Sequence, residues 1–186
     1  GWADTTLYGH TKFYNTQNLE RLAKRGMTFN HAYSASPLCS PTRSAILTGL
    51  SPARTGITTP NCHLPQVVLK ATPGVSAPPA AKSVQPEPVT RLKADYPTLA
   101  KSLKAAGYAT GHFGKWHLNG RFNDPAQPQP NDHGYDHWMA TQNNAGPSHK
   151  NPANFIRNGQ PVGKLAGFSA PLVADEAIDW LTTKRD

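Results

Sequence analysis

The chain has 186 residues, of which 37% are hydrophobic and 16% charged, a composition that excludes a wholly disordered polypeptide. No apolar run approaches the length needed to span a bilayer, so no membrane span is expected. Lys and Arg outnumber Asp and Glu by 19 to 11, and the net charge of +8 favours anionic ligands, although the basic residues are scattered along the chain.

Two elements are predicted before residue 35. Residues 15–25 have the apolar spacing of a helix, with a capping residue at the start and Gly26 after the end. Residues 27–33 alternate β-forming and polar side chains, which predicts a strand.

A short helix is predicted over residues 40–49. Ser40 can cap its start, Pro41 suits the first helical position, and Gly49 suits the end. Cys39 is therefore expected immediately before the amino end of this helix.

The segment 58–96 is rich in proline and is expected to form a long irregular excursion, in which Cys62 is a free or structural thiol. A helix over 97–106 is expected to end at Gly107. A strand follows over 108–113 and is expected to continue through residue 117.

Residues 119–168 are rich in Asn, Gly and Pro and predict loops with short strands. The last predicted element is a helix over 169–184 that Ser169 caps. Helices that alternate with short strands indicate the α/β class. The expected buried face of the last helix consists of Leu172, Val173, Ala177, Ile178 and Leu181.

The first candidate functional residues lie at the start of the helix over 40–49. A thiolate before a helix amino end is stabilised by free N–H groups and by the helix dipole, and the same position binds oxyanions. Arg43 follows Cys39 by four residues and therefore projects near the same turn. Its guanidinium suits a bidentate grip on a tetrahedral oxyanion, so Cys39 and Arg43 together indicate an oxyanion site.

A second candidate pair lies at the end of the strand that begins at residue 108. Lys115 and His117 are two residues apart, so a continuous strand directs both side chains to one face. An ammonium neutralises an anion, and an imidazole serves as general acid or base.

Two segments of the sequence resemble the signatures of the sulfatase family. Residues 37–49 (PLCSPTRSAILTG) resemble the first signature, whose centre is Cys-x-Pro-x-Arg, and residues 107–118 (GYATGHFGKWHL) resemble the second. Two long signatures in the expected order are more specific than either one. Further similar segments are 16–26, 132–136 and 157–159, so the resemblance covers nearly the whole chain.

The resemblance implies a fold and a mechanism. Residues 1–186 are expected to form an incomplete amino-terminal catalytic domain of the alkaline-phosphatase-like type, a mixed sheet with flanking helices that lacks the first and later strands. Cys39 is expected to be oxidised to formylglycine, whose hydrate attacks the sulfur of a sulfate ester. Arg43 is expected to hold formylglycine, Lys115 to bind sulfate oxygens, and His117 to orient or deprotonate the hydrate.

The resemblance also implies partners and a cofactor. A divalent cation, usually calcium, is expected to contact formylglycine at position 39, with its other ligands outside this chain, so the segment alone is expected to have little activity. The expected partners are a sulfate-ester substrate and a formylglycine-generating maturation enzyme, with no nucleic acid. A periplasmic, secreted or lysosomal location is implied.

Three alternatives stay open at this point. A formylglycine-dependent phosphonate monoester or phosphodiester hydrolase shares the same signatures, and a non-catalytic module that binds polyanions is compatible with the net charge. His133 and His137 lie close to Asp132 and Asp136 in the sequence and could form a metal cluster, although a structural turn is favoured there.

Overall fold

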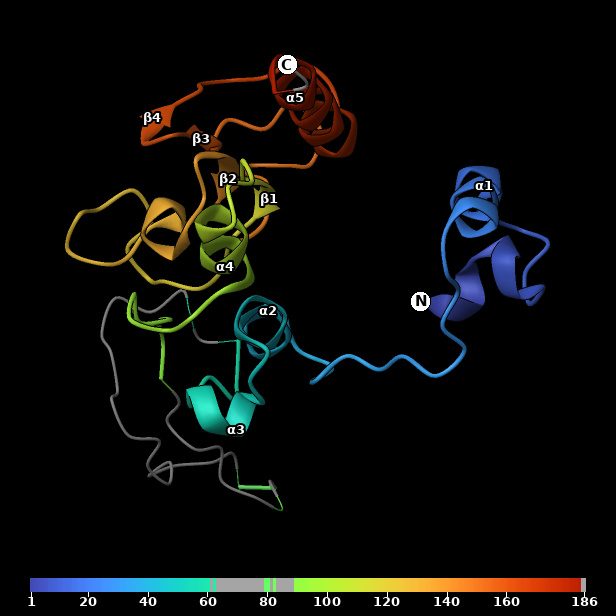
Figure 1. The fold of residues 1–186 in the computed structure, drawn as a ribbon, viewed down its shortest axis with the longest axis horizontal. Helices are drawn as coiled ribbons and strands as arrows, with labels where there is room; N and C mark the ends of the chain where they lie inside the picture. Colours follow the sequence, from blue (N-terminus) through green and yellow to red (C-terminus); the bar gives the residue numbers. More distant parts are fainter. Residues whose placement is uncertain (61, 63–78, 81, 83–88, 185–186) are drawn as a thin grey trace. The chain divides into compact units, whose positions relative to one another are not determined.

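The computed structural model describes residues 1–60, 62, 79–80, 82 and 89–184 (Figure 1). The chain divides into two compact units, Gly1–Ser34 and Ala35–Asp186. The predicted proline-rich excursion over 58–96 lies largely outside the described residues. One catalytic domain over 1–186 stays a prediction.

The first unit contains the predicted first helix, α1 (Gln17–Arg25), together with the 3₁₀ turns η1 (Trp2–Asp4) and η2 (Thr6–Tyr8). Thr16 is the N-cap of α1, and its hydroxyl accepts a hydrogen bond from the backbone N–H of Thr6 at 2.8 Å. The helix is confirmed, and this bond joins its start to η2.

The predicted strand over 27–33 is wrong, because this segment has no regular secondary structure. A strand needs a neighbour for its backbone N–H and C=O groups, and no strand pairs with it among the described residues. Its β-forming side chains are exposed, with Met27 at 77% and Tyr33 at 87%. The alternating pattern therefore reflects β propensity without a partner that satisfies it.

The second unit begins with α2 (Cys39–Thr48) and a single helical turn, α3 (Pro52–Thr55). Gly49 ends α2 in the left-handed conformation with φ 69°, as expected. The predicted start needs correction, since Leu38 is the N-cap and Cys39 is itself the first helical residue. The backbone of Leu38 is extended, and its carbonyl accepts from the N–H of Thr42 at 3.3 Å. Because this bond is the first of the helix, Cys39 lies within the first turn.

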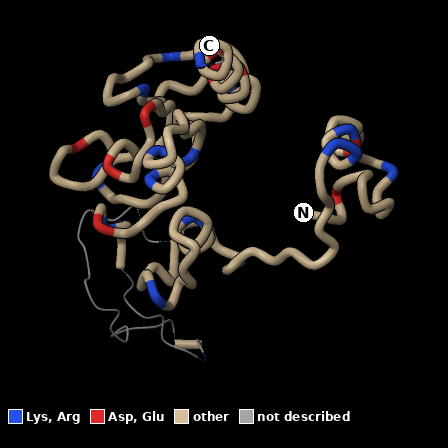
Figure 2. The backbone as a smooth tube through the Cα atoms, in the orientation of Figure 1, with Lys and Arg blue, Asp and Glu red and all other residues tan. Residues whose placement is uncertain are grey.

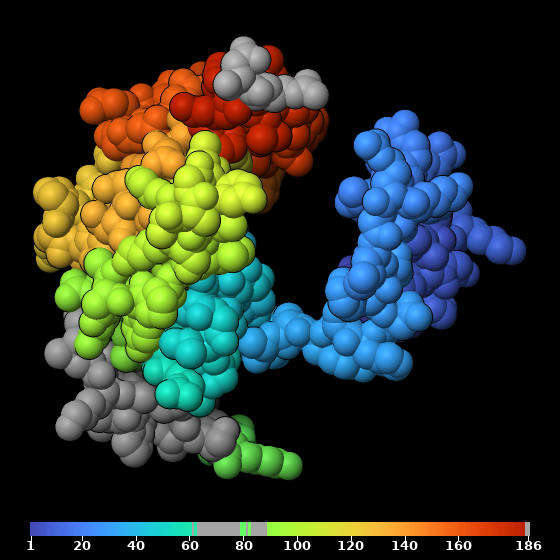
Figure 3. Space-filling model, viewed as in Figure 1, coloured from blue at the N-terminus to red at the C-terminus, as the bar shows by residue number. Residues whose placement is uncertain are grey.

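The predicted helix over 97–106 is confirmed as α4 (Leu99–Ala105). The hydroxyl of Thr98 caps the helix by accepting from the N–H of Lys101 at 3.1 Å, and it donates to the carbonyl of His133 at 2.6 Å. This pair of bonds joins α4 to the 3₁₀ turn η3 (Pro130–His133). In the second unit α2 packs against α4 (Figure 3).

A four-stranded sheet forms the centre of the second unit. Its strands are β1 (Gly111–Lys115), β2 (His137–Thr141), β3 (Ile156–Arg157) and β4 (Gln160–Pro161), in that spatial order. β1 and β2 are parallel, whereas the other pairs are antiparallel. The sheet is therefore mixed, which confirms the predicted α/β class.

The predicted strand over 108–117 is longer than the observed one, since β1 begins at Gly111 and ends at Lys115. The backbone still pairs beyond that end, because the N–H of Trp116 donates to Thr141 O at 2.9 Å. His117 has φ 57°, in the left-handed region, and this conformation stops the regular strand.

The last helix, α5 (Ser169–Thr183), packs on β1 (Figure 1). Glu176 joins it to the sheet by accepting from Arg157 Nε at 2.7 Å and by contacting His137 Nε2 at 2.9 Å. The predicted cap is wrong, since Ser169 is the first helical residue. Of the predicted face, Leu172, Val173 and Ala177 are half-buried. Ile178 and Leu181 are instead 59% and 55% exposed, because the half-buried side of α5 runs through Glu176 and Trp180.

The hydrophobic core of the second unit lies around the end of β1. Trp116 is 1% exposed and Trp138 is 3% exposed. The ring of Trp116 lies 5.4 Å from the buried imidazole of His133. The remaining core members are Ile57, Cys62, Val89, Leu92, Leu118 and Ala140.

Lys and Arg residues are spread over the elements of each unit (Figure 2). Among the described residues, no helix combines the length and the apolar character that crossing a membrane requires.

Candidate functional site

Cys39 stands at the amino end of α2, where the first N–H groups of a helix have no intrahelical acceptor. Its side chain is exposed, whereas the next two residues, Ser40 and Pro41, are buried. The thiol is thus exposed to solvent on a helical turn whose next two residues are buried. This position favours negative charge.

Arg43 connects this helix to β1. Its Nη1 donates to the carbonyl oxygen of Lys115 at 2.5 Å, and its Nε is buried with no acceptor among the described residues. Partial burial lowers the pKa of the guanidinium, and the charge of the Cys39 thiolate opposes that shift. An arginine remains charged under these conditions, so a cation lies beside Cys39.

Ser40 makes the second connection between α2 and the end of β1. Its hydroxyl donates to the carbonyl of His117 at 2.8 Å, and both residues are buried. The N–H of His117 donates to Gln142 O at 2.7 Å. Hydrogen bonds to both the carbonyl and the N–H of His117 therefore stabilise its left-handed backbone conformation. Because that conformation ends the strand, Lys115 and His117 do not share a face by the two-residue alternation that was predicted.

The side chain of Lys115 extends to the loop that follows β2, where its Nζ donates to Asn144 Oδ1 at 3.4 Å. The structure thus joins the helix that carries Cys39 and Arg43 to the segment that carries Lys115 and His117, and it places Asn144 against the side chain of Lys115. Sequence reasoning missed Asn144, although one signal was available. The carboxyl ends of parallel strands meet at one sheet edge, and a loop after the neighbouring strand can reach a residue that ends β1.

His112 lies within β1 and interacts with Arg43. Burial, and to a smaller extent the positive charge of Arg43, lowers the pKa of His112 to about 4, while a hydrogen bond with the backbone of Lys115 opposes the shift. The imidazole is therefore neutral near pH 7. A neutral ring next to Arg43 avoids adding a third cation to this part of the site.

The second cysteine, Cys62, is fully buried in the core and is a free thiol, as predicted. Burial raises its pKa to about 12, although a hydrogen bond with Ser40 lowers it. The thiolate is the reactive form of cysteine, so Cys62 is chemically inert at neutral pH.

We expect iodoacetamide at pH 8 to label Cys39 and to leave Cys62 unmodified in the folded, unmatured protein, because only Cys39 is exposed. Peptide mass spectrometry after brief labelling measures both sites. Repeating the reaction in 6 M urea provides the control, since unfolding should make both thiols reactive. Equal labelling of the two cysteines under native conditions would contradict the burial of Cys62.

The described residues contain no group of three or more His, Cys, Asp or Glu side chains placed to hold a metal ion. Calcium prefers several oxygen ligands, particularly carboxylates, whereas the charged partner of Cys39 here is the guanidinium of Arg43. These residues by themselves do not fit a calcium site. The alternative metal cluster of His133 and His137 with Asp132 and Asp136 is wrong, because the described residues form no such group: His133 is buried against Trp116 and His137 contacts Glu176.

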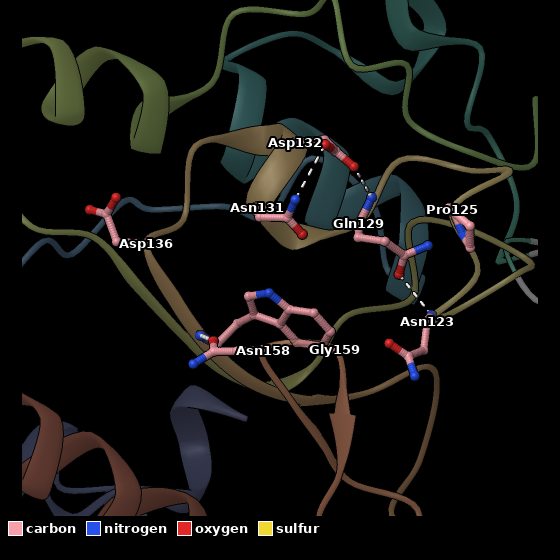
Figure 4. Close-up of a pocket in the computed structure, with 9 residues that line it drawn as sticks. Asn123, Pro125, Gln129, Asn131, Asp132, Asp136, Asn158 and Gly159 are labelled. Carbon is pink, nitrogen blue, oxygen red and sulfur yellow. Dashed lines mark hydrogen bonds between the residues drawn. The ribbon is translucent and has the colours of Figure 1, made fainter.

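A polar pocket lies elsewhere on the second unit (Figure 4). It opens near the beginning of β2, where Trp138 lies, whereas the candidate site is at the carboxyl ends of β1 and β2. Its carboxylates are already engaged, since Asp136 binds Thr110 and Asp132 binds the N–H of Gln129. The pocket is therefore distinct from the candidate site. Its lining consists of Asn123, Pro125, Gln129, Asn131, Asp132, Asp136, Trp138, Asn158 and Gly159.

The model of the family described as Sulfatase matches residues 1–186. The chain belongs to the sulfatase family. This membership agrees with the order of the two signatures and with the mixed α/β fold.

Among curated sulfatases, the chain is 38% identical over 148 residues to N-acetylgalactosamine-6-sulfatase of Sus scrofa, which covers 77% of this chain and 24% of the relative. It is 29% identical over 183 residues to the ulvan-active sulfatase of Formosa agariphila, with 97% of this chain and 30% of the relative covered. This sulfatase chain therefore spans about a quarter to a third of the length of these relatives.

A solved structure supports the same fold. It is a protein in complex with its substrate D-glucosamine-2-N,6-O-disulfate, with a TM-score of 0.67 and 26% sequence identity. The match covers 99% of the sulfatase chain described here and 29% of the solved chain.

Proposed function

We propose that this segment supplies the nucleophile and part of the oxyanion pocket of a sulfuric ester hydrolase. The observation that carries the proposal is the pair of bonds between α2 and the end of β1, from Ser40 to His117 O and from Arg43 to Lys115 O. These bonds connect the two signature segments, which lie more than 70 residues apart in the sequence. Membership of the sulfatase family supports the reaction class.

Each of the four candidate residues has a distinct role in the proposed reaction. Formylglycine made from Cys39 supplies, once hydrated, a hydroxyl nucleophile that displaces the alcohol from sulfur. Arg43 is held by Lys115 O and directs its positive charge toward position 39. Lys115 binds sulfate oxygens and neutralises negative charge that develops on them. His117, fixed by Ser40 and Gln142, orients or accepts a proton from the nucleophilic hydroxyl.

In the proposed enzyme, formylglycine at position 39 would contact a divalent cation, usually calcium in this family, and the other ligands would come from outside this segment. The segment alone should therefore have little or no sulfatase activity and bind calcium weakly. The complete enzyme is proposed to be exported to the periplasm, secreted or lysosomal. A maturation enzyme would recognise the string Cys-Ser-Pro-Thr-Arg, and the exposure of Cys39 is compatible with that access.

The mass of the tryptic peptide over residues 26–43 tests the proposal. Maturation replaces the CH₂SH group of Cys39 by an aldehyde, so the peptide from the full-length enzyme, expressed with a maturation enzyme, should be lighter by that difference. A Cys39→Ala variant provides the control, because its peptide cannot be converted. An unmodified Cys39 peptide from a preparation that actively hydrolyses sulfate esters would contradict the proposal.

A further inference from the structure

Asn144 lies on the loop directly after β2, at the sheet edge where β1 ends. The register of the parallel pair places Lys115 opposite Thr141, so the residues that follow β2 continue beside the end of β1. Asn144 is exposed, and its Oδ1 accepts a hydrogen bond from Lys115 Nζ at 3.4 Å. Its amide therefore lies next to the ammonium group of Lys115, the lysine that is proposed to bind sulfate, and is exposed to solvent there.

The backbone of this loop is fixed at several points. Asn154 bridges the loop by donating from Nδ2 to Asn144 O at 2.9 Å and by accepting the N–H of Gly146 at 2.7 Å. The hydroxyl of Thr141 donates to Asn143 O at 2.6 Å. The side chain of Gln142 donates to the carbonyls of Cys62 and Asn119. Asn144 thus projects from a fixed frame, which is what a recognition residue requires.

The hydrogen-bonding state of Asn144 leaves part of its amide available. An asparagine amide has one acceptor oxygen and two N–H donors. The oxygen is used by Lys115, whereas Nδ2 donates to no acceptor among the described residues. These donors suit a neutral oxygen such as a hydroxyl or a ring oxygen, because Lys115 already supplies the positive charge for sulfate.

We propose that Asn144 is a specificity-determining residue that binds a hydroxyl or ring oxygen of the alcohol part of the substrate, next to the sulfate held by Lys115. The substrate class that this pairing favours is a sulfate ester of a carbohydrate over one of a phenol. This inference rests on the proposed function, because it assumes that Lys115 binds sulfate. Asn154 acts only through the loop and is a positioning residue.

The test compares two substrates of the full-length, matured enzyme, a sulfated monosaccharide (galactose 6-sulfate) and 4-nitrophenyl sulfate. We expect Asn144→Ala to raise KM for the sugar about tenfold, the effect of losing one or two hydrogen bonds. The kcat/KM for 4-nitrophenyl sulfate should change by less than about twofold, since that ester has no hydroxyl for Asn144 to bind. Asn131→Ala is the matched control, because it removes an exposed amide on η3 that hydrogen-bonds Asp132 and lies outside the candidate site.

The outcomes separate this inference from the proposed function on which it rests. The role of Asn144 is refuted if Asn144→Ala leaves KM for the sugar unchanged, or lowers kcat/KM equally for both substrates. The sulfatase function still stands in that case if Lys115→Ala lowers kcat/KM for both substrates at least a hundredfold. If Lys115→Ala and Cys39→Ala both retain full activity, the proposed function itself is refuted. A selective rise in KM for the sugar supports Asn144 as the specificity residue.

Discussion

Cys39→Ala is expected to lower the hydrolysis of 4-nitrophenyl sulfate by the full-length enzyme at least about 1,000-fold, because the variant cannot form the nucleophile. The fold should be preserved, since the side chain is exposed at the start of α2 and a smaller alanine is a good helix former there. Steady-state kinetics on matured protein measures the loss.

Thermal unfolding and binding of a polyanion provide the controls for this variant. A melting temperature within about 2 °C of the parent shows that lost activity is chemical. A non-catalytic module that binds polyanions would retain its full activity after this change, so unchanged function in the variant favours that alternative. An aryl phosphodiester measured in parallel distinguishes a sulfatase from a phosphodiesterase of similar mechanism, because the parent should prefer the sulfate ester.

Acid is expected to destabilise the second unit between about pH 6.5 and pH 4. Burial lowers the pKa of His112 and of His133 to about 4 in the folded state, whereas an unfolded histidine titrates near 6.5. As the pH falls through this window, the unfolded state binds protons that the folded state excludes, so the free energy of unfolding decreases. The contribution of the neutral histidines to the free energy of unfolding is fully present above pH 6.5. Its loss on acidification amounts to at most about 3 kcal/mol for each histidine.

Urea unfolding of the full-length enzyme at pH 7.5, 6, 5 and 4.5 measures this dependence. His133→Gln provides the comparison, because it keeps a polar side chain of similar length next to Trp116 but cannot titrate. The variant should show a shallower loss of stability with acid than the parent. Identical pH profiles would contradict a neutral, buried His133.

The local elements were largely predictable because their signals are local. The helices α1, α2, α4 and α5 follow from apolar spacing and from ending residues such as Gly49. The strand predicted over 27–33 failed, because β propensity forms a strand only where a neighbour supplies hydrogen bonds. The buried face of α5 was only partly predicted, because its position on β1 is fixed by Glu176, which binds Arg157 and His137.

The sequence by itself determined the family and the identity of the four candidate residues, because each of the two signatures is a continuous string of residues. Only the tertiary structure decided how these residues meet, through the bonds of Ser40 and Arg43 to the end of β1. It also decided that Asn144 reaches Lys115. The physical reason is that hydrogen bonds between distant segments depend on the register of β1 and β2 and on backbone conformations such as that of His117, which no local pattern specifies.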